Sequence, residues 1–423
     1  MGWTAEDTLQ VEELGRRARA ASRHMAAAGP AAKNRFLARV AELLAGREGA
    51  LLAANAEDVA AARAAGLDAP RLDRLTLTPA ILAEMRAACL AVAGMPDPVG
   101  VTEHQWQRPN GLLVGRMRVP LGVIAMIYEA RPNVTVDAAI LCAKAGNAVI
   151  LRGGSEAVRS NRALAGVLRE ALADAGLPAD AVQLVATTDR AAVTALCKLN
   201  AYIDVIIPRG GEGLVRAVSE AATMPVLKHD KGVCHLYVDA GADLEMALRL
   251  VENGKTQRPG VCNALECLLV HRDVAAAFLP MVARSLGGAG VEFHADAASL
   301  PLLGPTAKPQ TPDDLGHEFH ALVLAVCVVE DMDAALAHIA AYGSNHSEVI
   351  CTRDYGRARR FLREADASMV AVNASTRFND GGQLGLGAEI GISTSKLHAY
   401  GPMGVTELTT TKFVVLGNGQ TRQ

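Results

Sequence analysis

Residues 122–153 read GVIAMIYEARPNVTVDAAILCAKAGNAVILRG, and this stretch decides the fold. It opens with a predominantly apolar run at 122–130 and continues with apolar residues at helical spacing over 134–145. A second apolar run follows at 148–153. Strands that are apolar on both faces and alternate with helices are typical of a parallel sheet covered on both sides. We therefore predict a doubly wound α/β fold around this stretch.

The same alternation continues toward the C-terminus. Further apolar strands are expected at 181–186 and 204–208. A second α/β series runs from 265 to 375, with predicted strands at 265–271, 320–329, 347–352 and 368–375. The sequence thus predicts two doubly wound α/β domains, and a site is expected where the two series join.

The segments around these series differ in character. Residues 5–95 are expected to be helical, because Phe36, Leu37, Val40, Leu43 and Leu44 recur at the helical period. Residues 98–120 surround Pro109-Asn110-Gly111 and predict a β-hairpin. A further β-rich stretch at 405–416 is a candidate partner for it. Because an isolated hairpin is marginally stable, we expect a small β flap that pairs within the chain or with another subunit.

Composition excludes several classes of protein. The 423 residues carry a net charge of −3 and only 4% aromatics, which gives no electrostatic footprint for nucleic acid. No run of about 18 apolar residues lacks a charge, so no transmembrane helix is expected. The polar N-terminal stretch does not resemble a signal peptide. A globular cytoplasmic protein without membrane or nucleic-acid partners is the expectation.

Cys262 is the candidate nucleophile, in the stretch KTQRPGVCNALECLLVH. Lys255 and Arg258 precede it, and a thiol on a turn near positive charge is placed to ionise. Thiolate is the form that attacks a carbonyl carbon. The alternative is a buried structural cysteine. The other cysteines lie mostly in apolar or Ala-rich runs that suit core thiols: Cys89, Cys142, Cys197, Cys234, Cys267, Cys327 and Cys351.

Two glycine-rich turns follow predicted strands. One contains Arg209, Gly210 and Gly211, and the other contains Arg152 and Gly153. Glycine at the start of a helix lets backbone N–H groups approach a phosphate. Neither turn matches GxGxxG. Two such turns at one sheet edge favour a nucleotide site, and tight strand-to-helix connections are the alternative.

Longer motifs indicate a family. The run 119–157 resembles the cofactor-domain core of the aldehyde dehydrogenase superfamily. KTQRPGVCNALE, VIIPRGG, SNHSEVICT and GLGAEIGISTSKLHAYGPMGVTELTTTK resemble its gamma-glutamyl phosphate reductase branch, and the resemblance covers about residues 10–417. It implies NADPH-dependent reduction of L-glutamyl 5-phosphate to the 5-semialdehyde through a Cys thioester, with phosphate release, in proline biosynthesis.

The resemblance also implies residue roles. Cys262 matches the nucleophile, and Asn133 matches the asparagine whose amide helps to hold the oxyanion. Glu318 matches a glutamate on the nicotinamide ribose, and Arg152 is a candidate for the 2′-phosphate of NADPH. The cofactor residues that we predict are Arg152, Gly153, Ser155, Glu156, Gly210, Gly211 and Glu318.

Four cations are candidate substrate ligands. Arg131 and Arg377 are candidates for the α-carboxylate, because guanidinium matches carboxylate geometry. Lys255 and Arg258 are candidates for the leaving phosphate. Structural salt bridges are the alternative for all four.

The sequence departs from general aldehyde dehydrogenases at one functional stretch. Lys228, His229 and Asp230 stand where those enzymes carry a glutamate base that activates water. Loss of that base suits a reductase, since water would waste the thioester. His229 as a base for Cys262 stays an alternative. An NAD-dependent aldehyde oxidiser would lack its usual base here, and a non-catalytic homologue would be expected to lose Cys262 or Asn133.

Metals, partners and domain limits complete the expectations. No CxxC pair occurs and no ligand cluster surrounds His317 and His320, so no metal is predicted. A homo-oligomer is expected, and association with glutamate 5-kinase stays open. The predicted domains are an NADPH-binding domain at 1–100 and 120–255, a catalytic domain at 256–392, and oligomerisation segments at 101–119 and 393–423.

Overall fold

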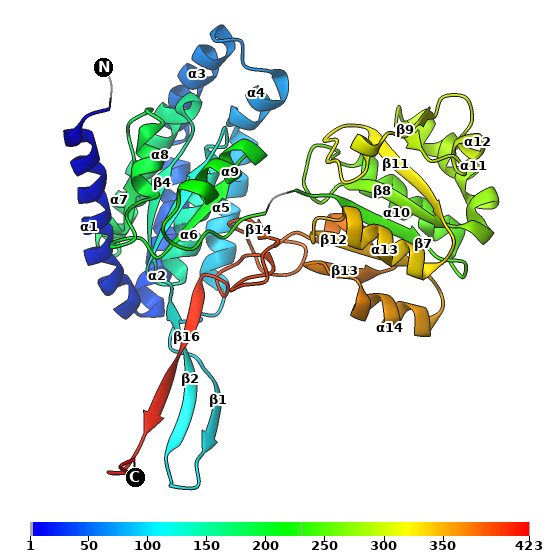
Figure 1. The fold of residues 1–423 in the computed structure, drawn as a ribbon. Coiled ribbons are helices and arrows are strands. Elements are labelled where there is room, and N and C mark those ends of the chain that lie inside the picture. Colours follow the sequence, from blue (N-terminus) through cyan, green and yellow to red (C-terminus); the bar gives the residue numbers. More distant parts are fainter. Residues whose placement is uncertain (1–2, 230, 423) are drawn as a thin grey trace. The chain divides into compact units, whose positions relative to one another are not determined.

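The computed structural model describes residues 3–229 and 231–422 (Figure 1). The chain forms two compact units. The first unit comprises residues 1–228, 385–391 and 403–423, and the second comprises residues 229–384 and 392–402. Each unit is built on a parallel sheet with helices in its connections, as the sequence predicts.

The first unit contains a four-stranded sheet in the order β5-β4-β3-β6, with all strands parallel. Its strands are β3 (Val123–Tyr128), β4 (Ala148–Arg152), β5 (Val182–Leu184) and β6 (Val205–Arg209). The connecting helices are α6 (Asn133–Lys144), α7 (Val158–Asp174), α8 (Ala191–Leu196) and α9 (Glu212–Ala221). β3 and β4 are buried along their whole length, which explains why they are apolar up to Arg152 at the end of β4. The prediction for 122–153 is confirmed.

Helices precede this sheet in the chain: α1 (Ala5–Ala27), α2 (Pro30–Gly46), α3 (Glu48–Ala64), α4 (Ala69–Leu75) and α5 (Pro79–Gly94). The five apolar residues of α2 that were predicted to share one face are all buried. Helix α2 packs on α5 and α7, so burial of this apolar face helps to hold the helical layer together.

A small antiparallel sheet, which we call the flap, belongs to the first unit. It consists of β1 (Thr102–Gln107), β2 (Leu113–Pro120) and β16 (Thr409–Leu416), in the order β1-β2-β16 (Figure 1). The predicted hairpin and its pairing with the C-terminal β-rich stretch are therefore confirmed within one chain. Whether the flap also pairs between chains stays a prediction.

The second unit contains a seven-stranded parallel sheet in the order β10-β9-β11-β8-β7-β12-β13. Its strands are β7 (Cys234–Val238), β8 (Leu265–His271), β9 (Glu292–Ala295), β10 (Lys308–Pro309), β11 (Val323–Val329), β12 (Ser347–Cys351) and β13 (Met369–Val372). Its helices include α10 (Leu244–Thr256), α11 (Arg272–Gly288), α12 (Leu300–Leu303), α13 (Met332–Tyr342) and α14 (Tyr355–Glu364). Alternate residues of β7 and β8 enter two separate hydrophobic clusters, so both sheet faces are covered.

The units divide between residues 228 and 229, whereas the sequence analysis placed the boundary between 255 and 256. Strand β7 is the reason. It was not predicted, yet it lies between β8 and β12 in the second sheet and brings α10 with it. Residues 393–402, predicted to belong to an oligomerisation segment, also fall in the second unit, whereas residues 385–391, predicted to belong to the catalytic domain, fall in the first.

None of the described helices is both long and apolar enough to cross a lipid bilayer.

Candidate active site

Cys262 lies in the turn between α10 and β8. All eight cysteines are among the described residues, and seven of them are buried, whereas Cys262 is partly exposed. The contrast drawn from the sequence is therefore confirmed at the level of burial. A nucleophile must reach its substrate, and of the eight thiols this one is accessible.

The backbone of Cys262 is held by residues at the start of β7, the strand that pairs with β8. The Cys234 thiol donates a hydrogen bond to the Cys262 carbonyl oxygen across 3.2 Å. Gly232 packs directly on the same carbonyl, since a Cβ atom added there would lie 2.1 Å from that oxygen. The turn before β7 therefore supports the nucleophile turn, and it can do so only where position 232 carries no side chain.

A buried polar network continues behind this turn. The Asn263 amide donates to the backbone carbonyls of Arg377 and Asn379, at 3.3 and 3.0 Å. The Asn379 amide donates in turn to the His346 carbonyl at 3.0 Å. Burial lowers the pKa of His346 to about 3, so its ring is neutral. The sequence analysis missed these residues, because they come from segments far apart in the chain.

Two of the predicted cations lie near the thiol. Arg377 is partly buried, and burial lowers the pKa of its guanidinium while the nearby Cys262 sulfur and Asp380 oppose that change. Its Nε donates to Gln257 at 2.8 Å. Arg258 is exposed and also lies within electrostatic range of Arg377. Arg377 therefore lies within electrostatic range of both Cys262 and Arg258, and two cations at this turn suit an anionic substrate.

Lys255 does not accompany them. Its side chain is fully buried and its Nζ lies 2.6 Å from Oε2 of Glu266, which is also fully buried. Burial lowers the pKa of Lys255 and raises the pKa of Glu266 to about 7. A buried, paired ammonium cannot meet a phosphate without breaking this pair, so the structural salt bridge that the sequence left as the alternative is what the structure contains.

Glu318 lies in the loop before β11, in the same unit as Cys262. Its Oε2 lies 3.4 Å from the His320 ring. Its Oε1 is buried and has no hydrogen-bond partner. An unpaired buried acceptor is costly, and a hydroxyl donor from a ligand would satisfy it. This fits the predicted contact with a ribose.

Asn133 is the first residue of α6 in the other unit. Its Nδ2 donates to the Asp137 carboxylate one turn later, at 2.9 Å. Burial raises the pKa of Asp137 to about 6, while Asn133 and Arg209 oppose the change. The contact orients the amide and uses one of its two N–H donors. The sequence analysis did not single out Asp137 as the partner of Asn133.

The turns after β3 and β4 are linked by Glu156. Its Oε1 accepts a hydrogen bond from the Ala130 N–H at 2.6 Å, and Ala130 has a positive φ of 37°. Arg131 directly follows this strained residue. Glu156 therefore holds the turn that leads to Asn133, which is a structural task. Ser155 beside it is exposed.

Arg152, which the sequence analysis predicted to bind the cofactor, is hydrogen-bonded to the protein backbone. Arg152 is 7% exposed, and its two Nη atoms donate to the carbonyls of Gly153, Thr188 and Asp189. Gly153 in turn has no room for a side chain, because an added Cβ would lie 2.1 Å from the Asn161 amide. Arg190 is exposed and lies within electrostatic range of Arg152. The exposed guanidinium belongs to Arg190, which the sequence analysis did not select.

The other glycine-rich turn, Gly210-Gly211, is hydrogen-bonded to a side chain of the protein. The Gly211 N–H donates to the Glu129 carboxylate at 2.9 Å, and an added Cβ at Gly210 would lie 2.5 Å from the same carboxylate. An anion of the protein itself thus occupies the position where a phosphate was predicted. For Gly210 and Gly211 the structure favours the tight connection, the alternative that the sequence left open.

Comparisons with known proteins give the family. Residues 2–311 match the aldehyde dehydrogenase family. The gamma-glutamyl phosphate reductase of Nitratidesulfovibrio vulgaris (strain Hildenborough) is 71% identical over 414 residues, which span 98% of this chain and 99% of that protein. The chain belongs to the gamma-glutamyl phosphate reductase branch of the aldehyde dehydrogenase family.

Solved structures agree with this membership. The crystal structure of gamma-glutamyl phosphate reductase from Thermotoga maritima is similar with a TM-score of 0.95 and 45% identity, over 98% of this chain and 100% of that one. The acetylating aldehyde dehydrogenase from Geobacillus thermoglucosidasius, with 18% identity and a TM-score of 0.69, shares the fold over 99% of this chain and 98% of that one. The resemblance read from the sequence is confirmed, and the chain is an oxidoreductase of this family.

In this member of the family, the stretch of the missing base is only partly described. The ring of His229 meets the ring of His346 edge-on, with centroids 6.4 Å apart. Asp230 lies outside the described residues. His229 as a base for Cys262 therefore stays an untested alternative.

Proposed function

We propose that this chain reduces L-glutamyl 5-phosphate to L-glutamate 5-semialdehyde with NADPH, and releases phosphate, in proline biosynthesis. The observation that carries the proposal is the accessible Cys262 thiol beside Arg258 and Arg377, in a chain 71% identical to a gamma-glutamyl phosphate reductase. Both cations suit a substrate with phosphate and carboxylate groups.

The chemistry that we propose for Cys262 is nucleophilic catalysis. Its thiolate attacks the acyl carbon, the C–O bond to phosphate breaks, and a thioester remains on the sulfur. NADPH held by Glu318 and Arg190 would supply the hydride that converts the thioester to a thiohemiacetal. Collapse of that adduct breaks the C–S bond, and the thiolate is restored as the aldehyde leaves.

Other side chains receive roles in binding. We assign the second N–H of Asn133 to the developing oxyanion, together with the backbone N–H of Cys262. Arg131 and Arg377 remain our candidates for the α-carboxylate, and Arg258 for the leaving phosphate. Lys255 is withdrawn from this set because it is buried against Glu266.

The cofactor assignment rests on two side chains of the described structure. The unpartnered Oε1 of Glu318 suits a nicotinamide ribose hydroxyl. The exposed guanidinium of Arg190 suits a 2′-phosphate, which would give a preference for NADPH.

The test is the reverse reaction. Glutamate semialdehyde should reduce NADP⁺ only when phosphate is present, and Cys262→Ala should lower this rate by several orders of magnitude while NADPH still binds. Cys351→Ala, which alters a buried thiol of β12, is the matched control and should keep its activity. Oxidation without phosphate, or a labelled acyl adduct on another cysteine, would overturn the proposal.

A further inference from the structure

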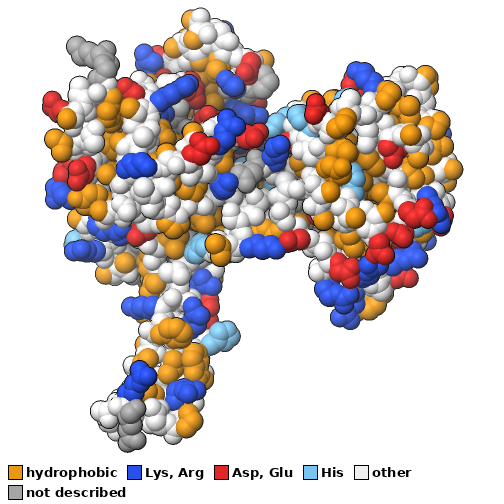
Figure 2. All heavy atoms as spheres, in the orientation of Figure 1, with side chains coloured by type: hydrophobic (Ala, Val, Ile, Leu, Met, Phe, Trp, Pro, Cys, Tyr) orange, Lys and Arg blue, Asp and Glu red, His pale blue; other side chains and the backbone are white. Residues whose placement is uncertain are grey.

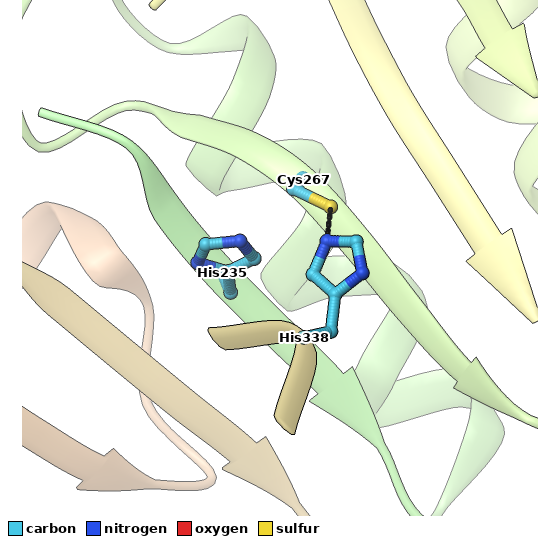
Figure 3. Close-up of side chains that lie close together, drawn as sticks. All are labelled: His235, Cys267 and His338. Atoms are coloured by element: carbon cyan, nitrogen blue, oxygen red, sulfur yellow. Dashed lines mark hydrogen bonds between the residues drawn. The ribbon is translucent and has the colours of Figure 1, made fainter. Parts of the chain in front are cut away.

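A second group of chemically active side chains lies in the sheet of the second unit. Glu348 on β12, His235 on β7 and Cys267 on β8 are direct cross-strand neighbours in successive registers. Directly paired residues of adjacent strands point to the same sheet face. The three side chains therefore form a row across three strands, and His338 comes to this row from α13. Figure 3 shows His235, Cys267 and His338 side by side.

His235 is held in an orientation that a metal ligand requires. The residue is fully buried, and its Nδ1 lies 3.0 Å from Oε2 of the equally buried Glu348. Its Nε2 is buried and has no hydrogen-bond partner. A carboxylate on one ring nitrogen and an unused second nitrogen is the arrangement found around metal-bound histidines.

Cys267 and His338 complete a ligand set. The Cys267 sulfur lies 3.6 Å from Nε2 of His338 (Figure 3). The rings of His235 and His338 meet at nearly a right angle, with centroids 5.5 Å apart. Ligand atoms of all three residues lie within 4.8 Å of one another. Ligand atoms around tetrahedral zinc are roughly 3.5 Å apart, so the widest pair needs to close by about 1 Å.

We propose that His235, Cys267 and His338 bind one zinc ion. Imidazole and thiolate are ligands that zinc prefers, and three of them leave a fourth position for an exogenous ligand. Binding breaks the S–H bond of Cys267 and releases its proton to solvent, because the thiolate is the ligand. The ion would also give the unpaired Nε2 of His235 a partner.

The protonation states of the cluster set the condition for binding. Contact with Cys327, together with burial, raises the pKa of Cys267 well above its ordinary range. Burial and the neighbouring His235 lower the pKa of His338 to about 4, so its ring is neutral and its lone pair is available. A coordinating metal deprotonates a thiol outright, so the raised pKa of Cys267 does not prevent binding.

The position of this site links it to the nucleophile. Gly232 and Cys262 lie in the turns that lead into β7 and β8, the two strands that supply His235 and Cys267. An ion that ties these strands to α13 would fix the two turns against each other. Zinc should therefore raise the melting temperature of the full chain.

Cobalt is the probe, because Co²⁺ replaces zinc and reports a thiolate ligand by a near-ultraviolet charge-transfer band. The full chain, stripped with chelator and carrying Cys262→Ser to exclude the nucleophile, should bind one Co²⁺ with this band and lose it on adding Zn²⁺. Cys267→Ser should abolish the band. Glu348→Gln should weaken binding by about 10–100-fold, since that carboxylate only orients His235.

The control is Cys351→Ser, which alters a buried thiol of the same sheet outside the cluster and should keep the band. If Cys267→Ser does not fold, His338→Gln decides, because this residue is only partly buried on α13 and its loss should weaken binding at least tenfold. No thiolate band in the stripped chain, or unchanged binding in His338→Gln, would overturn the proposal and leave a metal-free histidine–cysteine core.

Discussion

The amide of Asn133 is positioned by the Asp137 carboxylate, whose burial disfavours its charged form. Asp137 accepts the hydrogen bond from Asn133, and burial raises the pKa of Asp137 to about 6 from an ordinary value of 3.8. Between pH 3.8 and about 6, the folded state therefore keeps the Asp137 proton, whereas the unfolded state has already lost it. Stability from this group is fully present below pH 3.8 and is lost as pH rises through about 6.

Asp137→Asn should therefore stabilise the chain at neutral pH and not in acid. At roughly 1.4 kcal/mol for each pKa unit, the gain at pH 7 is about 1–3 kcal/mol and vanishes near pH 4. Urea unfolding of both proteins at the two pH values measures it. Asp73→Asn, which removes an exposed carboxylate of α4, is the control and should change neither value. An equal gain at both pH values would show that the charge of Asp137 is not the cause.

Arg190 and Arg152 should differ in what they contribute. Loss of a charge-assisted hydrogen bond costs about 1.5–3 kcal/mol, so Arg190→Ala should raise the KM for NADPH by about 10–100-fold and leave that for NADH unchanged. Arg152→Ala should instead lower the melting temperature, because this guanidinium holds three backbone carbonyls. Steady-state kinetics with both cofactors, beside thermal melts, separates the two. A selective NADPH defect in Arg152→Ala alone would reverse the assignment.

Among the elements, the turn before β7 most directly controls the nucleophile. Gly232→Ala would place a methyl group 2.1 Å from the Cys262 carbonyl oxygen, so the Cys262 backbone must move. Because a displacement of about 1 Å can cost about 100-fold in rate, kcat/KM should fall by that order. The rate of Cys262 alkylation by iodoacetamide should change in parallel.

The matched control lies just after the same strand. A Cβ at Gly241 would meet its nearest atom, Oδ2 of Asp239, at 3.5 Å, which is ordinary contact. Gly241→Ala should therefore keep both the activity and the alkylation rate. If Gly232→Ala were equally silent, the packing of this turn on Cys262 would not matter for catalysis.

How far the sequence predicts these elements depends on how local their cause is. The run at 122–153 was read correctly, since apolar strands and helical spacing are written in adjacent residues. Strand β7 was missed because it is only five residues long and is stabilised by pairing with β8 and β12, which lie elsewhere in the sequence. Lys255 was placed beside the substrate because it precedes Cys262 in sequence, but helix α10 turns it inward to Glu266. Likewise, no spacing rule joins positions 235, 267 and 338.

At the scale of the whole molecule, the flap carries an apolar surface that one chain does not cover. Trp106 pairs with Val114, which pairs with Val415, so these three side chains share a face. Phe413, two residues before Val415, lies on that face as well. Trp106, Phe413 and Val415 are 39–64% exposed. Figure 2 shows hydrophobic side chains gathered on this sheet.

A second copy of the chain is the occupant that we propose for this face. β1 is exposed along its whole length and is an edge strand of the flap, as is β16. Open edges pair readily with other strands, and a two-fold contact brings the same surface of each copy together. The flap would then be an intersubunit sheet, as the sequence analysis expected.

The double substitution Phe413→Glu and Val415→Glu should therefore convert the oligomer to monomers, because like charges would meet across a two-fold contact and the apolar burial would be lost. Light scattering at several concentrations measures the mass directly. Lys412→Glu is the matched control: it changes charge on the same strand but on the opposite face, and it should keep the oligomer. If the double variant kept the oligomer, or if the unaltered chain were already a monomer, this face would not be the contact between copies.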